Sequence, residues 1–334
     1  MSGLRWGVLS TARINDALLG AGAADVVAVA SRSSERAEAY AKARGLPRAF
    51  GSYEALLADP DIDAVYISLP NGMHVPWSIR ALEAGKHVLC EKPLSRSADA
   101  VRAAFDAAQR AGRLLVEGFM WRHHPQVARA QQLLADGAVG RVSLLRARFS
   151  GPISPTDRAA VDPRLRRDLE GGALMDVGCY CVSGVRALAG AEPEAVHAMR
   201  IAGGEDVDEV LAGLLRFPGD VLASIDCGFI LAEEDVLEAV GDAGILRLTD
   251  PWHARAPVIE IDRGGGDGVE RIEVERVNHY ALELQAFEAA VRGERPPVPE
   301  RTDSEGQART IEALYASAER GAATPVPAAV TAPS

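Results

Sequence analysis

Residues 5–15 read RWGVLSTARIN. Apolar side chains dominate positions 6–9, small and polar residues follow from Ser10, and a helix-like stretch begins near Asn15. A short, almost continuous apolar run is typical of a strand that is buried on both faces, as in a parallel sheet whose strands are joined by helices. This stretch therefore predicts the first strand, turn and helix of an open α/β sheet.

The same alternation continues to about residue 120. Four more apolar runs predict strands at 25–32, 63–70, 86–93 and 113–119, and helix-like segments stand at 34–45, 52–60, 74–86 and 97–112. Several of these helices are followed by glycine, which commonly ends a helix. Strands that alternate with helices predict a doubly wound parallel sheet of the Rossmann type, which we assign to residues 1–122.

From about residue 123 the apolar runs become longer and fewer helices separate them. Turn signals such as FPGD at 217–220 and GDAG at 241–244 stand between several of the runs. We therefore predict a second, α+β domain over residues 123–334, built on a large, mainly antiparallel open sheet. Its strands are expected at 141–150, 195–202, 208–217, 220–230, 236–241, 244–250, 257–262 and 271–277, with helices at 127–140, 280–293 and 303–321. The Ala/Pro-rich tail after about residue 321 is expected to be poorly ordered or to pack back.

The open face of this second sheet is expected to be partly apolar. The strands at 141–150 and 220–230 carry apolar residues at positions that should point away from the helices. A sheet covered by helices on one face leaves its other face to solvent or to another subunit. We therefore expect a homodimer or homotetramer that forms through this open face.

Composition argues against several classes of partner. The chain of 334 residues has a formal net charge of −11 and no cluster of basic and aromatic residues, so we expect no binding to nucleic acid. It has no apolar run near the ~20 residues that span a bilayer, and no signal-peptide pattern at its start. We expect no membrane partner and a cytoplasmic location. The four cysteines are scattered, which favours buried, reduced thiols.

The turn after the first strand has the position of a nucleotide-binding loop. Backbone N–H groups at such a strand-to-helix turn bind pyrophosphate, and glycines in a GxGxxG pattern usually permit the close approach. Here Ser10, Ala12 and Asn15 occupy the three glycine positions, so a plain structural turn is the alternative. The second strand ends in Ser31 and Arg32 without an acid. This favours NADP, with NAD as the alternative, because arginine accommodates a 2′-phosphate.

Three residues could carry proton chemistry. Lys92 follows the apolar run in HVLCEKPL (87–94), at the edge where open α/β sheets bind ligands. Asp176 and Tyr180 stand four apart in GGALMDVGCYCV (171–182), which would place them on one helix face. A carboxylate beside a phenol suits acid–base work if a cation such as Lys92 lowers the phenol pKa from about 10. The alternative is a core tyrosine and a helix-terminal aspartate.

Two further groups of residues are ambiguous. His123 and His124 are adjacent, so their side chains diverge, and no acid or cysteine at ligand spacing supports them; we predict no metal site. The loop at 151–170 could bind an anionic substrate, although a solvated loop is the simpler interpretation. Its basic residues are Arg158, Arg164, Arg166 and Arg167.

Five short motifs are distributed along the chain. They are LPNGMH at 69–74, EKP at 91–93, GFMWRHHPQ at 118–126, DxGxY at 176–180 and YALELQAFEAAVRGE at 280–294. Together they resemble the motifs of the Gfo/Idh/MocA family of NAD(P)-dependent oxidoreductases, over essentially the whole chain. With tyrosine at position 180, the chain is similar to one branch of this family. That branch contains dihydrodiol dehydrogenases, NADP-dependent xylose dehydrogenases, glucose-fructose oxidoreductase and sugar 3-ketoreductases.

This resemblance implies hydride transfer between NADP and a carbinol or carbonyl carbon of a sugar, sugar derivative or cyclic diol. Lys92, joined to Pro93 by a cis bond, would contact the reacting oxygen; Tyr180 would exchange the hydroxyl proton; Asp176 would hold a substrate hydroxyl. With the residues above, the implied cofactor site is Ser10, Thr11, Ala12, Arg13, Ile14, Ser31, Arg32, Leu69, Pro70, Asn71, His74, Glu91, Lys92 and Pro93. The implied substrate site is Lys92, Phe119, Trp121, Arg122, Asp176 and Tyr180.

Two other functions fit the same resemblance. A non-catalytic, NAD(P)-binding regulator would keep the nucleotide site, but such proteins tend to lose the lysine that stands here at position 92. An aldose–ketose exchange enzyme would hold its nucleotide permanently, and would use a long N-terminal arm that we do not expect here.

Overall fold

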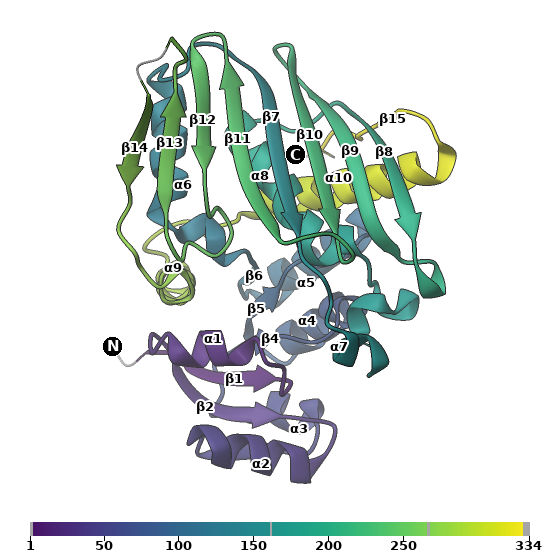
Figure 1. Ribbon diagram of the computed structural model, residues 1–334. Helices are drawn as coiled ribbons and strands as arrows, with labels where there is room; N and C mark the ends of the chain where they lie inside the picture. Colours follow the sequence, from purple (N-terminus) through teal and green to yellow (C-terminus); the bar gives the residue numbers. More distant parts are fainter. Residues whose placement is uncertain (1–2, 161, 266–267, 330–334) are drawn as a thin grey trace. The chain divides into compact units, whose positions relative to one another are not determined.

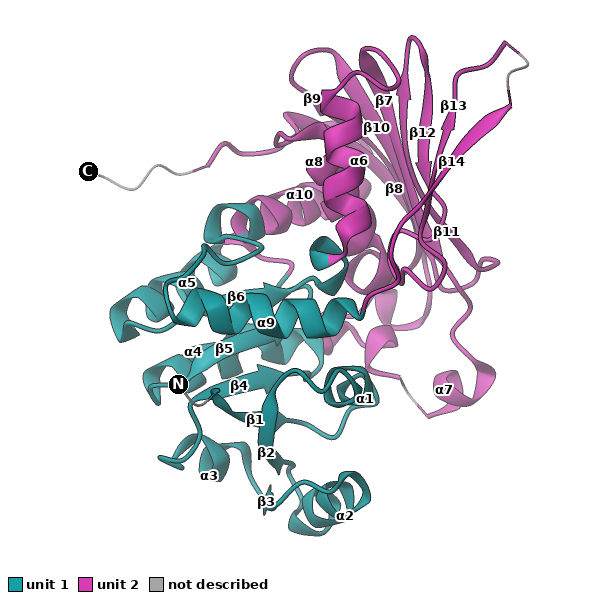
Figure 2. Ribbon diagram, turned by 90° about the vertical axis from the view of Figure 1, so that its left-hand side faces the viewer, with its two compact units in different colours: residues 1–95, 99–123, 278–304 teal, residues 96–98, 124–277, 305–334 magenta. Residues whose placement is uncertain are grey.

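The computed structural model describes residues 3–160, 162–265 and 268–329, which form two compact units. Unit 1 comprises the chain up to residue 95, residues 99–123 and residues 278–304 (Figure 2). Unit 2 comprises residues 96–98, residues 124–277 and the chain from residue 305. The units differ from a single division after residue 122, chiefly because residues 278–304 belong to unit 1.

Unit 1 contains the predicted parallel sheet. Its six strands lie in the order β3-β2-β1-β4-β5-β6, and all neighbouring pairs are parallel (Figure 1; β3 is labelled in Figure 2). They are β1 (Arg5–Leu9), β2 (Asp25–Ala30), β3 (Arg48–Phe50), β4 (Ala64–Ile67), β5 (His87–Glu91) and β6 (Leu115–Gly118). The strand order reverses between β1 and β4, as in a doubly wound sheet, which confirms the predicted fold class. The sequence analysis missed β3 because three residues are too few for a periodic signal.

Helices cover this sheet, and β4 and β6 are buried at every position. The helices of the predicted alternation are α1 (Asn15–Gly20), α2 (Ser34–Arg44), α3 (Tyr53–Leu57), α4 (His74–Glu83) and α5 (Ala98–Ala111). The hydroxyl of Ser33 accepts the N–H of Arg36 and caps the start of α2, and Gly45 ends this helix in the left-handed conformation. The serine and the glycine therefore begin and end α2 as these residue types predict.

Helix α9 (His279–Val291) belongs to unit 1, although it follows the strands of unit 2 in the sequence. Its Phe287 ring packs against Trp6 of β1 at a centroid distance of 4.9 Å. The Trp6 indole donates to Glu288, 282 residues away, at 3.1 Å. Leu284 of α9 lies in the same core as Leu18 and Trp6. These contacts explain why the sequence order of the helix is a poor guide to the unit that it joins.

Unit 2 is built on a nine-stranded sheet in the order β14-β13-β12-β11-β7-β10-β9-β8-β15. Only β7 and β10 pair in parallel among these neighbours, so the sheet is mainly antiparallel, as predicted. Its strands are β7 (Val142–Ser150), β8 (Ala195–Ala202), β9 (Asp208–Phe217), β10 (Val221–Gly228), β11 (Glu234–Gly241), β12 (Gly244–Leu248), β13 (Val258–Asp262), β14 (Val269–Glu273) and β15 (Thr324–Pro325).

One face of this sheet is covered by helices. They are α6 (Pro125–Ala135), α8 (Cys179–Ala189) and α10 (Arg301–Arg320), and Figure 2 shows them on the same side of the strands. The short α7 (Pro155–Ala159) lies in the loop after β7. Near the end of the described chain, Thr324 and Val326 are buried, and the N–H of Val326 donates to Glu194 at 2.9 Å. This part of the tail packs back onto the sheet.

The opposite, outer face of the sheet is divided into two halves. Over β7 and β11–β14, oppositely charged residues stand directly across from one another in one row, and each neighbouring pair forms an ion pair. The row is Arg146, Glu238, Arg247, Glu260 and Arg271. Over β8–β10 the same face exposes Met199, Ile201, Leu214 and Leu222. The charged half therefore satisfies its own charges, whereas the apolar half is left uncovered.

Two expectations from composition concern membrane-spanning helices and cysteines. Within the described ranges, no helix combines the length and the apolar composition needed to cross a bilayer. All four cysteines are buried and none forms a disulfide bond, which agrees with the expectation of buried, reduced thiols. Burial raises the pKa of the Cys90, Cys181 and Cys227 thiols, so thiolate chemistry is disfavoured at these positions.

Candidate active site

The predicted site residues divide between the two units. The cofactor residues, Lys92 and the segment at 119–122 belong to unit 1, whereas Asp176 and Tyr180 belong to unit 2. In unit 1 the predicted residues gather where the parallel strands end, and in unit 2 they gather at the start of α8.

The turn after β1 is held by polar side chains where glycines were expected. Ser10 has a φ of 135°, in the region that favours glycine, and its hydroxyl accepts the N–H of Ala12 at 3.1 Å. Asn15 is fully buried, and its amide donates to the Ser10 carbonyl at 3.1 Å. The Asn15 oxygen accepts the hydroxyl of Ser68, which follows β4, at 2.5 Å. Asparagine at the third glycine position therefore links the ends of two neighbouring strands.

The remaining residues of this turn are accessible. Thr11 and Ala12 are half-buried, and Arg13 and Ile14 are exposed. The turn lies between the end of β1 and the start of α1, where small and accessible residues leave room for a ligand close to the backbone. Their contact with a cofactor stays a prediction.

Two arginines lie near the end of β2. Ser31 is buried, and its N–H donates to the Phe50 carbonyl of β3 at 3.0 Å, whereas Arg32 is exposed. Burial raises the pKa of the Tyr53 phenol, and the positive charges of Arg32 and Arg36 oppose this rise. Both guanidinium groups therefore lie near the same ring. Arg36 was not among the expected site residues; it lies in the first turn of α2, four residues after Arg32, which precedes the helix.

The loop that follows β4 is tied to the loop that follows β5 by His74. Its ring nitrogens lie 2.8 Å from the carbonyl oxygen of Pro93 and 2.7 Å from that of Leu69. Burial lowers the His74 pKa to about 4, so the ring is neutral near neutral pH and donates to one of these two oxygens. His74 thus holds the loop, while Pro70 and Asn71 between these contacts are half-buried.

Lys92 follows β5 directly and precedes a cis peptide bond to Pro93, as the resemblance implied. Two carboxylates hold this turn. Glu91 accepts the Lys92 backbone N–H at 3.3 Å and the Tyr66 hydroxyl at 2.5 Å. Glu117, buried at the end of β6, accepts the N–H of Leu94 at 2.9 Å. The sequence analysis did not single out Glu117, whose position at a strand end was the available signal.

Lysine is rare among the basic residues of this chain. The chain contains 36 basic residues, and only Lys42, Lys86 and Lys92 are lysines. Lys86 has a structural role, because its ammonium group donates to the carbonyls of Asp59 and Ile62. Unlike arginine, lysine can release a proton when its surroundings favour the neutral amine. In a chain that otherwise uses arginine, a lysine at the edge of the sheet fits a chemical role.

A second buried carboxyl group belongs to this part of unit 1. Glu283 of α9 is 1% exposed, and among the described residues neither of its oxygens has a hydrogen-bond partner. Burial raises its pKa well above the usual range, and the nearby charge of Glu91 adds to the rise. Burial therefore favours the protonated form of Glu283.

The segment after β6 is more buried than a substrate-binding role would suggest. Phe119 and Trp121 are 2% and 0% exposed, and Arg122 forms an ion pair with Asp303 at 3.0 Å. His124 caps α6 through its ring nitrogen, which accepts the N–H of Gln126 at 3.2 Å. Direct contact of Phe119, Trp121 or Arg122 with substrate stays a prediction.

In unit 2, the helix that carries Asp176 and Tyr180 begins at a tightly packed glycine. Gly172 has a φ of 129°, and a Cβ there would lie 2.1 Å from the Asp208 carboxylate. That buried carboxylate accepts the Leu174 N–H at 2.7 Å and the Tyr315 hydroxyl at 2.8 Å. Asp208 therefore fixes the start of the helix, and only glycine fits beside it.

The helix is not regular over the predicted pair. Residues Leu174–Gly178 form a π-helix, and α8 begins at Cys179, so Asp176 and Tyr180 lie on either side of the junction. Single π-turns occur often at functional sites. Tyr180 is 6% exposed and packs edge-on against Phe149 at 5.4 Å and against Trp252 at 5.8 Å. The simple expectation of one regular helical turn between the two residues was wrong in this detail.

The arginine-rich loop after β7 is paired internally. Arg164 bonds Asp162 and lies 3.5 Å from the Asp176 carboxylate, and both acids help to hold its pKa above the usual range. The other three arginines also face acids of unit 2. The pairs are Arg158 with Glu209, Arg166 with Asp168, and Arg167 with Asp206. Acids of the loop and of neighbouring segments of unit 2 therefore neutralise these arginines, which disfavours the alternative of an anionic substrate.

Comparisons with known proteins agree with both units. Residues 5–119 match a family model described as an oxidoreductase family with an NAD-binding Rossmann fold. Residues 127–247 match the GFO/IDH/MocA C-terminal domain.

Several characterised proteins are similar along most of the chain. D-xylose 1-dehydrogenase (NADP(+)) 2 of Haloferax volcanii is 38% identical over 301 residues, which cover 90% of this chain and 91% of that protein. Trans-1,2-dihydrobenzene-1,2-diol dehydrogenase of Xenopus laevis is 36% identical over 73% of this chain and 74% of its own length.

Solved structures show the same similarity. The 3-ketoreductase KijD10 from Actinomadura kijaniata, in complex with NADP and TDP-benzene, superimposes with a TM-score of 0.87 at 32% identity. The match covers 95% of this chain and 98% of that one. Structures of KijD10 also exist with a single tyrosine or a single lysine replaced.

The raised pKa of Glu283 predicts a pH-dependent stability. Because burial raises its folded pKa above the unfolded value near 4.3, the free energy of unfolding falls as pH rises above about 4.3. Glu283→Gln removes this loss, so the Tm of the variant should exceed that of the wild type at about pH 8 and approach it near pH 4. Thermal melts followed by circular dichroism measure the difference.

The matched control for this experiment is Glu38→Gln, at an exposed position on α2. It should change the Tm little at any pH. A Glu283→Gln protein that melts like the wild type at every pH would show that Glu283 is not protonated in the folded state.

Proposed function

Because the chain belongs to the Gfo/Idh/MocA family of oxidoreductases, we propose that it transfers hydride between NADP and a carbinol or carbonyl carbon of a sugar, sugar derivative or cyclic diol. The observation that carries this proposal is the position of Lys92 at the end of β5. Glu91 accepts the backbone N–H of Lys92, and Glu117 accepts that of Leu94. The chain is also similar along its length to NADP-linked enzymes. Enzymes that act on free xylose and on a cyclic diol are among these relatives.

Features of unit 1 support NADP as the cofactor. The turn at Ser10–Ile14 is accessible at the carboxyl end of β1, where such sheets bind nucleotides. Arg32 and Arg36 lie together at the end of β2, a position at which an acid would favour NAD. We infer that this pair holds the 2′-phosphate and that the turn holds the pyrophosphate. When bound, NADP supplies the hydride acceptor or donor.

Three side chains would divide the remaining chemistry. In oxidation, the substrate C–H bond breaks with its electron pair, and the O–H proton must leave so that the carbonyl can form. Tyr180 takes this proton, and gives it back in reduction. Lys92 stabilises the negative charge that develops on the substrate oxygen. Asp176, held by Arg164, accepts a neighbouring substrate hydroxyl and orients the reacting carbon.

This assignment predicts the effect of two substitutions on turnover. Lys92→Ala and Tyr180→Phe should each lower kcat by about 100-fold or more, because each removes a group that acts on the reacting oxygen. The Kd for NADP should change little in Tyr180→Phe. NADPH absorbance with aldoses, ketoses and cyclic diols measures kcat, and Lys42→Ala, at an exposed position on α2, is the control. Wild-type turnover in either variant would refute the assignment.

The arginine pair makes a prediction about cofactor preference. Replacing both Arg32 and Arg36 by alanine should weaken NADP binding roughly 10- to 100-fold, because charge-assisted hydrogen bonds to the 2′-phosphate are lost. NAD binding should stay unchanged. Fluorescence titration with NADPH and NADH measures both, with the exposed Arg110→Ala as control. Equal losses for the two nucleotides would contradict a 2′-phosphate site.

We also propose that a second copy of the chain covers the apolar half of the outer sheet face. Met199 and Leu214 are 75% and 60% exposed there, and an apolar patch of this kind commonly marks an interface. The adjacent charged row is already paired, so it has less need of a partner. The interface would therefore centre on β8–β10, and two copies would form a dimer or, with a further contact, a tetramer.

This proposal predicts the solution mass. Light scattering at micromolar concentration should give a dimer or tetramer for the wild type, and Met199→Glu with Leu214→Glu should give a monomer that remains folded, because two charges would be buried in the interface. Circular dichroism checks the fold. A monomeric wild type would overturn the proposal.

A further inference from the structure

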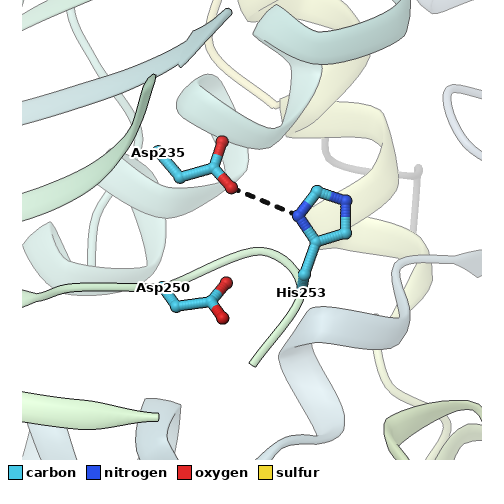
Figure 3. Close-up of side chains that lie close together, drawn as sticks. All are labelled: Asp235, Asp250 and His253. Atoms are coloured by element: carbon cyan, nitrogen blue, oxygen red, sulfur yellow. Dashed lines mark hydrogen bonds and ion pairs between the residues drawn. The ribbon is translucent and has the colours of Figure 1, made fainter. Parts of the chain in front are cut away.

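A histidine that the proposed reaction does not use lies beside Tyr180. His253 stands in the loop between β12 and β13, and its side chain is 32% exposed. Its Nδ1 lies 3.2 Å from a carboxylate oxygen of Asp235, which is on β11 (Figure 3). The pair belongs to unit 2, as Tyr180 does.

Phe149 connects this pair to Tyr180. Asp235 is the direct neighbour of Phe149 across the β7–β11 pairing. The Phe149 ring meets Tyr180 edge-on at 5.4 Å and His253 edge-on at 5.5 Å. The Tyr180 and His253 rings therefore lie within about 11 Å of each other around one shared ring. A monosaccharide with its hydroxyl groups can bridge that distance.

The loop that carries His253 is fixed from both sides. The indole of Trp252 donates to the Arg148 carbonyl at 3.1 Å, and its ring packs on Tyr180. Asp250 accepts the backbone N–H groups of Arg255 and Ala256 at 2.6 Å and 3.1 Å, and thereby shapes the turn. His253 is therefore held in place before any ligand arrives, which lowers the entropic cost of binding.

The contact with Asp235 also sets the chemistry of the ring. A carboxylate at Nδ1 favours the tautomer that carries its proton there, which leaves a lone pair on Nε2. Figure 3 shows Nε2 on the side of the ring away from Asp235. In this tautomer Nε2 can accept a hydrogen bond from a hydroxyl group. Beside aromatic rings, this is the combination of apolar wall and placed polar group that small-molecule sites use.

We infer that His253, oriented by Asp235, accepts a hydrogen bond from a substrate hydroxyl that does not itself react, and so helps to select hydroxylated ring substrates. This inference rests on the proposed function, because it places the substrate beside Tyr180. The internal pairing of the loop arginines fits the same class of neutral, polyhydroxylated substrate.

Asp235, Asp250 and His253 also place one ligand-type atom each within 4.8 Å of one another. One oxygen of Asp250 already accepts two backbone N–H groups, which assigns it to the loop. The histidine therefore has a hydrogen-bonding role, and metal chelation distinguishes this role from a metal site.

Two substitutions of the same residue test the inference. Asparagine at 253 can keep a donor toward Asp235 but lacks an atom at the Nε2 position, whereas glutamine can reach that position. His253→Asn should raise KM for the substrate about tenfold with kcat nearly unchanged, because one hydrogen bond is lost. His253→Gln should retain most of the wild-type KM. In both variants the Kd for NADP and the Tm should stay close to the wild-type values.

Analogues of the best substrate that each lack one hydroxyl group distinguish the loss of one hydrogen bond to His253 from a general effect of the substitution on the structure. One analogue should lose about tenfold in kcat/KM with the wild type and lose nothing further with His253→Asn, because the missing hydroxyl is the one that His253 holds. Losses of equal size for every analogue would overturn the inference, as would an unchanged KM in His253→Asn. Activity of the wild type that is lost with EDTA and restored by Zn²⁺ would also overturn it, in favour of a metal.

The failure of the proposed function would look different. In that case the wild type would show no NADP-linked activity with any aldose, ketose or cyclic diol, and Tyr180→Phe would behave like the wild type.

Discussion

The parallel sheet of unit 1 is buried on both faces, so its polar groups can be placed only where the strands end. This constraint explains why residues of very different chemistry share one edge. Strand interiors such as β4 and β6 are buried throughout, and a polar group there would need a partner. The strand ends instead carry hydroxyl, carboxyl and ammonium groups. They are Ser10 after β1, Ser31 after β2, Ser68 after β4, Glu91 and Lys92 at β5, and Glu117 in β6.

Several of these residues are held by hydrogen bonds at the same edge. Asn15 links Ser10 to Ser68 and so replaces, with hydrogen bonds, the close packing that glycines would allow. Glu91 accepts the backbone N–H of Lys92 and Glu117 accepts that of Leu94, so the backbone of this turn is held in position. Such contacts hold a reactive group in place, which is the main condition for its use in catalysis.

In unit 2 the two faces of the nine-stranded sheet have different roles, because successive side chains along a strand point to opposite faces. The outer face carries the paired charged row and the apolar half, and the inner face carries Phe149 and Asp235. The latter two residues meet the start of α8 and the loop after β12, where Tyr180 and His253 lie. An aromatic wall next to a tyrosine and an oriented histidine suits a ring that presents both C–H groups and hydroxyls.

The sequence by itself determined the elements and the main chemical candidates. Apolar periodicity and glycine or serine signals depend on residues only a few positions apart, and they located five of the six parallel strands, the strands of the second sheet other than β15, and the lysine at the edge of β5. The tertiary structure alone decided which distant residues meet. It brought α9 to Trp6, gave Asn15 its partner in Ser68, paired the loop arginines with acids, and set Asp235 beside His253. These pairings arise from long-range packing and strand register, and no local pattern of residues encodes them.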